Sequence, residues 1–145
     1  MADLNALNSS WTPRLLSVLR IVTAFFFMLH GAQKVFGFLA PAGAQGPPMF
    51  GQIWIGGVLE FFGGLLLLLG LFTRPVAFIL SGMMAVAYFQ MHFLPALAKG
   101  NPGWFWPIAQ GGNGGELAAV YCFVFLFLAV AGGGEWSLDR SLRRR

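Results

Sequence analysis

Five side chains that can exchange protons or donate hydrogen bonds interrupt the apolar stretches of the sequence. They are His30, Lys34, Glu60, Tyr88 and His92. A charged side chain in the hydrocarbon core of a bilayer costs on the order of 2.5–3.5 kcal/mol, so such residues usually pair with one another or serve a function. We therefore treat these five as candidates for binding a ligand or handling protons. The sequence assigns none of them a catalytic role.

The composition of the chain indicates an integral membrane protein. Of its 145 residues, 57% are hydrophobic and 10% are charged, whereas a soluble domain has roughly 25% charged residues. Four apolar segments cover residues 15–38, 53–71, 76–93 and 116–131. The first three reach the length of about 17–25 residues that a membrane span requires, and the fourth is slightly short. Because lipid cannot satisfy backbone amides, we expect an all-α integral membrane four-helix bundle.

The distribution of basic residues predicts the domain organisation and the orientation. The chain divides into an N-terminal segment (1–14), a four-span domain (15–131) and a basic tail (132–145). Both termini lie on one side with most of the arginines, so the excess of Lys and Arg in cytoplasmic loops predicts that both termini are cytoplasmic. We expect the tail to contact anionic lipid head groups. The sequence has no basic stripe with stacking aromatics, so we expect no nucleic-acid partner.

The candidate residues lie at similar depths on the inward faces of their helices. Lys34 and His30 lie about 6 and 12 Å from the outer end of the first span, and Glu60 about 10 Å from that of the second, at the rise of an α-helix. We predict that Lys34 and Glu60 form an ion pair and that all five candidates line one cavity in the outer half of the bundle. A purely structural role for the ion pair and a histidine hydrogen bond stays open beside a ligand site.

Other residues are predicted to have structural roles. Five glycines of the second span and its end resemble a close-packing seam of the kind that lets membrane helices approach. They are Gly56, Gly57, Gly63, Gly64 and Gly70. The sequence NGGE matches a capping box, with Asn113 as the N-cap and Glu116 three residues later.

Several kinds of chemistry are disfavoured by the sequence. Cys122 is the single cysteine, so the chain cannot form an internal disulfide or a dithiol couple. His30 and His92 could bind a metal with Glu60 or ligate a haem, but neither shows a spaced ligand motif, and we predict no metal site. The chain has no nucleophile elbow, phosphate loop or dinucleotide-binding glycine pattern.

Three segments resemble the DoxX family of membrane proteins. They are RIVTAFFFMLHGAQKVFGF (20–38), GVLEFFGGLLLLLGLFTRPVA (57–77) and NGGELAAVYCFVFLFLA (113–129). The resemblance implies a four-helix inner-membrane protein. Members of the family have been associated with quinone-linked oxidoreductases, including thiosulfate oxidation and terminal oxidase complexes, and with oxidative-stress complexes. The single cysteine departs from the thiol-redox chemistry of the broader superfamily.

Three functions remain open on the sequence. The first is a quinone-interacting or redox-complex-associated subunit, in which a partner oxidoreductase chain supplies electrons because this chain has no cofactor motif of its own. The second is a non-catalytic assembly subunit of a membrane complex. The third is a small transporter or lipid-binding protein, which the lack of an inverted repeat or broken helix disfavours. The sequence does not decide whether the chain is an enzyme, and a homo-oligomer is compatible with it.

Overall fold

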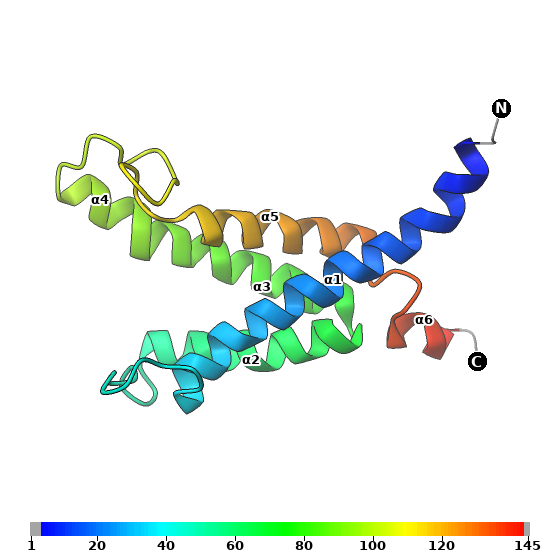
Figure 1. Ribbon diagram of the computed structural model, residues 1–145, viewed down its shortest axis with the longest axis horizontal. Coiled ribbons are helices and arrows are strands. Elements are labelled where there is room, and N and C mark those ends of the chain that lie inside the picture. Colours follow the sequence, from blue (N-terminus) through cyan, green and yellow to red (C-terminus); the bar gives the residue numbers. More distant parts are fainter. Residues whose placement is uncertain (1–3, 144–145) are drawn as a thin grey trace.

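In the computed structural model, which describes residues 4–143, the chain is helical and its four main helices run back and forth along one long axis (Figure 1). The elements are α1 (Leu4–Phe36), α2 (Gln52–Leu69), α3 (Thr73–Ala87), the π-helical η1 (Tyr88–Phe93), α4 (Leu94–Ala98), α5 (Glu116–Ala131) and α6 (Leu138–Arg143). The described residues contain no strand. The predicted all-α fold is therefore confirmed.

Three stretches of helix are long and apolar enough to cross a membrane. They are Ser10–Phe36, Gln52–Leu69 and Thr73–Ala98, and α5 is a shorter apolar helix of 16 residues. The first helix begins at Leu4, inside the segment predicted to precede the spans. The third continues past residue 93 through η1 into α4, because Pro95 falls in the first turn of α4, where a missing N–H is tolerated.

The four long helices form two pairs. α1 packs along α2, and α3 packs along α5. A short link at residues 70–72 joins α2 to α3 at one end, and the pairs diverge toward the opposite end (Figure 1). Aromatic and aliphatic side chains fill the space between the pairs, with Phe27 of α1, Leu80 of α3 and Phe125 of α5 almost fully buried. Large apolar side chains such as Phe62 and Phe123 cover the outer surface, as a bilayer-embedded bundle requires.

Glycines on α1 and α2 let these two helices approach closely. A Cβ atom on Gly31 would lie 2.5 Å from the carbonyl oxygen of Gly57, and one on Gly64 would lie 2.9 Å from Cβ of Met28. Gly31, Gly57 and Gly64 therefore form the seam between α1 and α2. The seam predicted from the sequence did not include Gly31, the residue of α1 that packs against the glycines of α2.

The remaining glycines of the predicted seam do not pack against α1. Gly63 faces Leu80 of α3, and a Cβ atom added to Gly56 would have nothing within 4 Å. Gly70 ends α2 with a positive φ of 69°, and the bonds from Gly70 N to Leu67 O and from Leu71 N to Leu66 O form the turn typical of helix C-termini. Periodicity placed all these glycines on one side, but a helix that contacts two neighbours divides them between two faces.

The predicted capping box at Asn113 and Glu116 is wrong. α5 begins at Glu116 with Gly115 as its N-cap, and no side chain caps it. Gly114 has a positive φ of 76°, so the chain turns before the helix starts. Asn113 organises that turn: its Oδ1 accepts a hydrogen bond from Gly115 N at 2.8 Å, and its Nδ2 donates to Tyr88 Oη at 3.0 Å.

Candidate ligand-binding site

Lys34 and Glu60 form the ion pair predicted from the sequence. Lys34 Nζ lies 2.6 Å from Glu60 Oε1 and 2.7 Å from Oε2. The Glu60 side chain is buried, with 8% of its surface exposed, and that of Lys34 is 34% exposed. The pair joins α1 to α2 beside the close contact of Gly31 with Gly57. Its burial makes it costly to separate, because a lone carboxylate would remain in a low-dielectric environment.

A cavity of about 290 Å³ opens beside this ion pair. We call it the central cavity. All four long helices and η1 contribute to its wall, which consists of Phe27, His30, Lys34, Glu60, Met84, Ala87, Met91, His92, Gly114, Leu117, Ala118 and Tyr121. Four of the five candidate residues therefore meet around one space. Few polar groups within a mostly apolar wall are typical of small-molecule sites.

Several donors at the central cavity are not used within the protein. A lysine ammonium has three N–H groups, and Glu60 accepts from Lys34 at two positions. His30 contacts the ring of Tyr121 edge-on, with 6.3 Å between centroids, and makes no hydrogen bond within the described residues. His92 Nδ1 lies 3.3 Å from Asn113 O, which leaves its Nε2 without a partner in the same part of the chain. These groups can therefore serve a bound ligand.

Tyr88 is the candidate that the structure places outside the central cavity. Its hydroxyl accepts the hydrogen bond from Asn113, and its ring contacts Phe89 and Phe93. The prediction that Tyr88 and His92 line the same cavity assumed α-helical spacing between them. Both residues lie in the π-helical segment η1, where each turn holds more residues, so the α-helical spacing does not apply.

A second cavity of about 290 Å³ lies on the other side of the ion pair, between α2 and the α3–η1 helix. We call it the side cavity. Lys34 and Glu60 line both cavities. Gln52 Nε2 donates a hydrogen bond to Gln90 Oε1 across the side cavity. The ion pair is thus a polar partition between two small apolar spaces, an arrangement that the sequence did not indicate.

Aromatic rings close the inner end of the central cavity. The ring centroids of Phe27 and Tyr121 are 5.0 Å apart, and those of Phe27 and Phe125 are 4.7 Å apart. Tyr121 and Phe125 stack nearly parallel, at 5.6 Å. Because these side chains are almost fully buried, they form a rigid floor that separates the central cavity from the opposite end of the bundle.

That opposite end holds a second buried cation, Arg20, which is 0% exposed. Its guanidinium donates to four backbone carbonyls and to no carboxylate. They are those of Leu67, Leu68 (2.7 Å), Gly133 (2.8 Å) and Trp136 (2.6 Å). The two leucines belong to the last turn of α2, where unpaired carbonyls and the helix dipole favour a cation. We call this arrangement the Arg20 junction.

The segment after α5, predicted as a basic tail on the membrane surface, folds back onto the Arg20 junction. Glu135 N donates to Pro13 O at 3.0 Å, and Trp136 N donates to Ser17 Oγ at 2.9 Å. The side chains of Arg14 and Glu135 form an ion pair at 3.0 Å. This part of the tail is therefore integrated with α1.

Asp139 of α6 fastens the same segment to α3. Its carboxylate accepts hydrogen bonds from Phe72 N and Thr73 N, both at 2.8 Å, and so caps α3 from a distant part of the chain. Burial acts to raise the pKa of Asp139, but the hydrogen bonds from Thr73 and Phe72 and the charge of Arg143 outweigh it and lower the pKa below its ordinary value. The sequence alone did not predict that Asp139 caps α3, because an exposed helix end can also be capped by water.

No three His, Cys, Asp or Glu residues among those described are close enough to hold a metal ion. Cys122 is half-buried, and its sulfur lies 3.6 Å from Ser81 Oγ.

Comparisons with known proteins indicate a membrane protein. Residues 15–93 match the sequence profile of the DoxX family. An uncharacterized protein of Haemophilus influenzae is 45% identical over 139 residues, covering 93% of this chain and 96% of the relative. An uncharacterized membrane protein of Mycobacterium tuberculosis is 32% identical, covering 100% and 96%. The inner membrane protein YphA of Escherichia coli is 30% identical, covering 88% and 90%. No solved structure matches the chain.

Proposed function

The chain belongs to the DoxX family of membrane proteins, and we propose that it binds a quinone head group in the central cavity as a subunit associated with a redox complex. The observation that carries the proposal is the set of unused polar groups around one mostly apolar space: donors of Lys34 and His30 and the free Nε2 of His92. A quinone ring requires this combination, because its faces are apolar and its two carbonyl oxygens accept hydrogen bonds.

The residues of the central cavity would have different roles in binding the quinone. Lys34 can donate its third N–H to one carbonyl oxygen while its other two remain with Glu60. His30 is exposed and His92 is half-buried, and an imidazole can both donate and accept a proton. Phe27 and Tyr121 offer an aromatic floor.

Reduction of a bound quinone to the quinol requires two electrons and two protons. We propose that a partner oxidoreductase chain supplies both electrons, since this chain has no redox cofactor motif. The protons would come from the aqueous phase through His30 and His92, which lie on the cavity wall. The role of this chain is then to hold the quinone and deliver protons.

A purely structural function also has an observation in its favour. Glu60 is fully paired with Lys34 without any ligand, so the pair can hold α1 and α2 together in an assembly subunit. The two functions differ in one measurable property, because an assembly subunit has no saturable affinity for quinone.

The test is a titration of a short-chain quinone against the purified protein in detergent, followed by quenching of tryptophan fluorescence. We expect saturable binding that weakens about tenfold in His30→Ala and in Glu60→Gln, the loss typical of one hydrogen bond involving a charged or donor group. Tyr88→Phe is the matched control, because Tyr88 does not line the cavity. Equal, non-saturable partitioning into all variants would leave the assembly function.

We also propose that the chain resides in the bacterial inner membrane with both termini in the cytoplasm. The inner-membrane relative and the excess of arginine at the end that carries the termini support this. A reporter that is active only in the cytoplasm, fused after Arg145, should be active. Activity of a periplasmic reporter at the same position would reverse the orientation and place the opening of the central cavity on the cytoplasmic side.

A further inference from the structure

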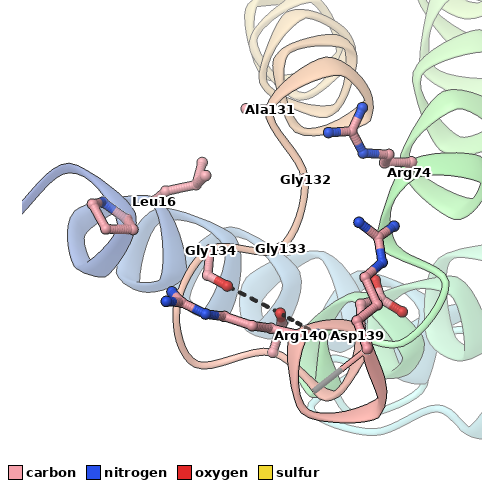
Figure 2. Close-up of a pocket in the computed structure, with 11 residues that line it drawn as sticks. Leu16, Arg74, Ala131, Gly132, Gly133, Gly134, Asp139 and Arg140 are labelled. Carbon is pink, nitrogen blue, oxygen red and sulfur yellow. Dashed lines mark hydrogen bonds between the residues drawn. The ribbon is translucent and has the colours of Figure 1, made fainter. Parts of the chain in front are cut away.

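A third cavity, also of about 290 Å³, lies at the end of the bundle that holds the Arg20 junction. The start of α3, the end of α5, the glycine segment 132–134 and α6 surround it (Figure 2). Figure 2 shows Arg74 beside Gly132 and Arg140 beside Gly134. Arg143 completes a set of three guanidinium groups on the wall, against one carboxylate, that of Asp139. We call this cavity the basic pocket.

The carboxylate of Asp139 is already engaged, so the basic pocket keeps an excess of positive charge. Both of its oxygens accept backbone hydrogen bonds from the start of α3. The side chains of Arg74 and Arg140 make no hydrogen bond or ion pair with the residues that the structure describes. By contrast, Arg14 is paired with Glu135, and Arg20 with four carbonyls.

Phosphate is the anion that such a group of arginines fits best. A guanidinium presents paired N–H donors in a rigid fork that matches two phosphate oxygens. The glycine segment contributes no side chains, and Gly132 holds a positive φ of 88° that glycine adopts without strain. A phosphate group can therefore approach the backbone there as well as the arginines.

The position of the basic pocket points to a lipid as the source of the phosphate. Arg74 is the second residue of α3, and Ala131 is the last residue of α5, so the pocket lies where two apolar helices end. Leu16 and Ala131 add apolar surface to its wall, against which the glycerol and upper acyl carbons of a lipid can pack. Basic pockets at the ends of membrane helices bind anionic head groups in this way.

We propose that the basic pocket binds the phosphate group of an anionic phospholipid and that this binding stabilises the packing of α6 against α3 and α5. The site is separate from the central cavity and does not depend on quinone binding. It gives the tail a defined lipid contact, at a pocket shared with Arg74, rather than a general attraction to the membrane surface.

Native mass spectrometry of the full chain, released from a neutral detergent, tests this proposal. Phosphatidylglycerol and phosphatidylcholine are titrated separately into wild type and into Arg74→Gln, Arg140→Gln and the double variant. We expect phosphatidylglycerol to bind wild type with a defined stoichiometry. Each substitution should weaken binding about fivefold, the effect expected for one arginine near an anionic membrane surface.

Arg14→Gln is the charge-matched control, because Arg14 lies at the same end of the bundle but outside the pocket. It should change the affinity for phosphatidylglycerol by less than about twofold. Equal loss in Arg14→Gln and Arg74→Gln, or equal affinity for both lipids, would overturn the proposal.

Titration of inorganic phosphate without lipid separates the two sources of phosphate. Thermal stabilisation by phosphate that disappears in the double variant would support the pocket and identify free phosphate as its ligand. Stabilisation by phosphatidylglycerol alone would support the lipid. If neither ligand stabilises the folded wild type, the basic pocket is not a phosphate site.

Discussion

α1 carries two buried or half-buried cations, Arg20 and Lys34, which differ in solvent exposure and in the groups that they contact. Arg20 is sealed from solvent, and its donors are saturated by the carbonyls of α2 and of the segment after α5. Lys34 is partly exposed, pairs with a carboxylate, and lies between two cavities. The comparison indicates that Arg20 is saturated by the fold, whereas the partly exposed Lys34 borders two cavities.

The largest loss of stability should result from substitution of Arg20. Arg20→Met removes a donor from four buried carbonyls, of which that of Leu67 keeps its bond from Gly70 N, and we expect a loss of about 4 kcal/mol in the free energy of unfolding. Unfolding by increasing fractions of a denaturing detergent measures the loss. Arg20→Lys should recover only part of it, since a lysine is a point charge that cannot reach all four acceptors. A loss as small as that of Arg14→Met would mean that the junction is not structural.

The next largest loss of stability should result from breaking the Lys34–Glu60 pair. Lys34→Met alone should destabilise the protein by about 3 kcal/mol, the low end for a broken buried pair, because Lys34 is partly exposed. The double variant Lys34→Met, Glu60→Gln should be more stable than Lys34→Met alone, because no unpaired carboxylate remains. A double-mutant cycle with no coupling energy would contradict the pair.

A moderate effect should come from the seam that connects the two cations along α1. Gly31→Ala places a methyl group 2.5 Å from Gly57 O, and such overpacking costs about 1–3 kcal/mol. Gly56→Ala is the matched control on α2, because nothing lies within 4 Å of its added methyl group. It should stabilise the protein by up to about 1 kcal/mol, because alanine has the higher helix propensity. An equal gain in Gly31→Ala would mean that helix propensity, and not the seam, determines the result.

The smallest effect should come from the cap of α3 by Asp139. Asp139→Asn should cost about 1 kcal/mol at neutral pH, the usual value of a helix cap. The folded-state pKa of Asp139 is lowered from its ordinary value of 3.8, so its contribution is full above that value and is lost as the pH falls through the lowered pKa. Thermal unfolding of both proteins from about pH 7 to pH 3 should therefore show converging stabilities. A constant difference across this range would exclude the charge of Asp139 as the cause.

Composition and segment length predicted the helical membrane fold, because an apolar helix in lipid has few alternatives. The Lys34–Glu60 pair could also be predicted, since two opposite charges at matched depth are costly when separated. Tyr88 could not be placed, because the π-helical segment η1 departs from α-helical spacing and no sequence signal marked it. The Arg20 junction was missed because its acceptors are backbone carbonyls, which every residue carries. The glycines at 132–134 were the one available sign of a close approach there.

The unequal lengths of the helices have a consequence for the surrounding membrane. The apolar part of α1 spans 27 residues, or about 40 Å, whereas the 16 residues of α5 reach about 24 Å. Against a hydrocarbon core of about 30 Å, the first helix must tilt and the bilayer must thin beside the second. Leu117, near the start of α5, lines the central cavity. Thinning of the bilayer at this end of α5 would therefore bring the aqueous boundary closer to the cavity.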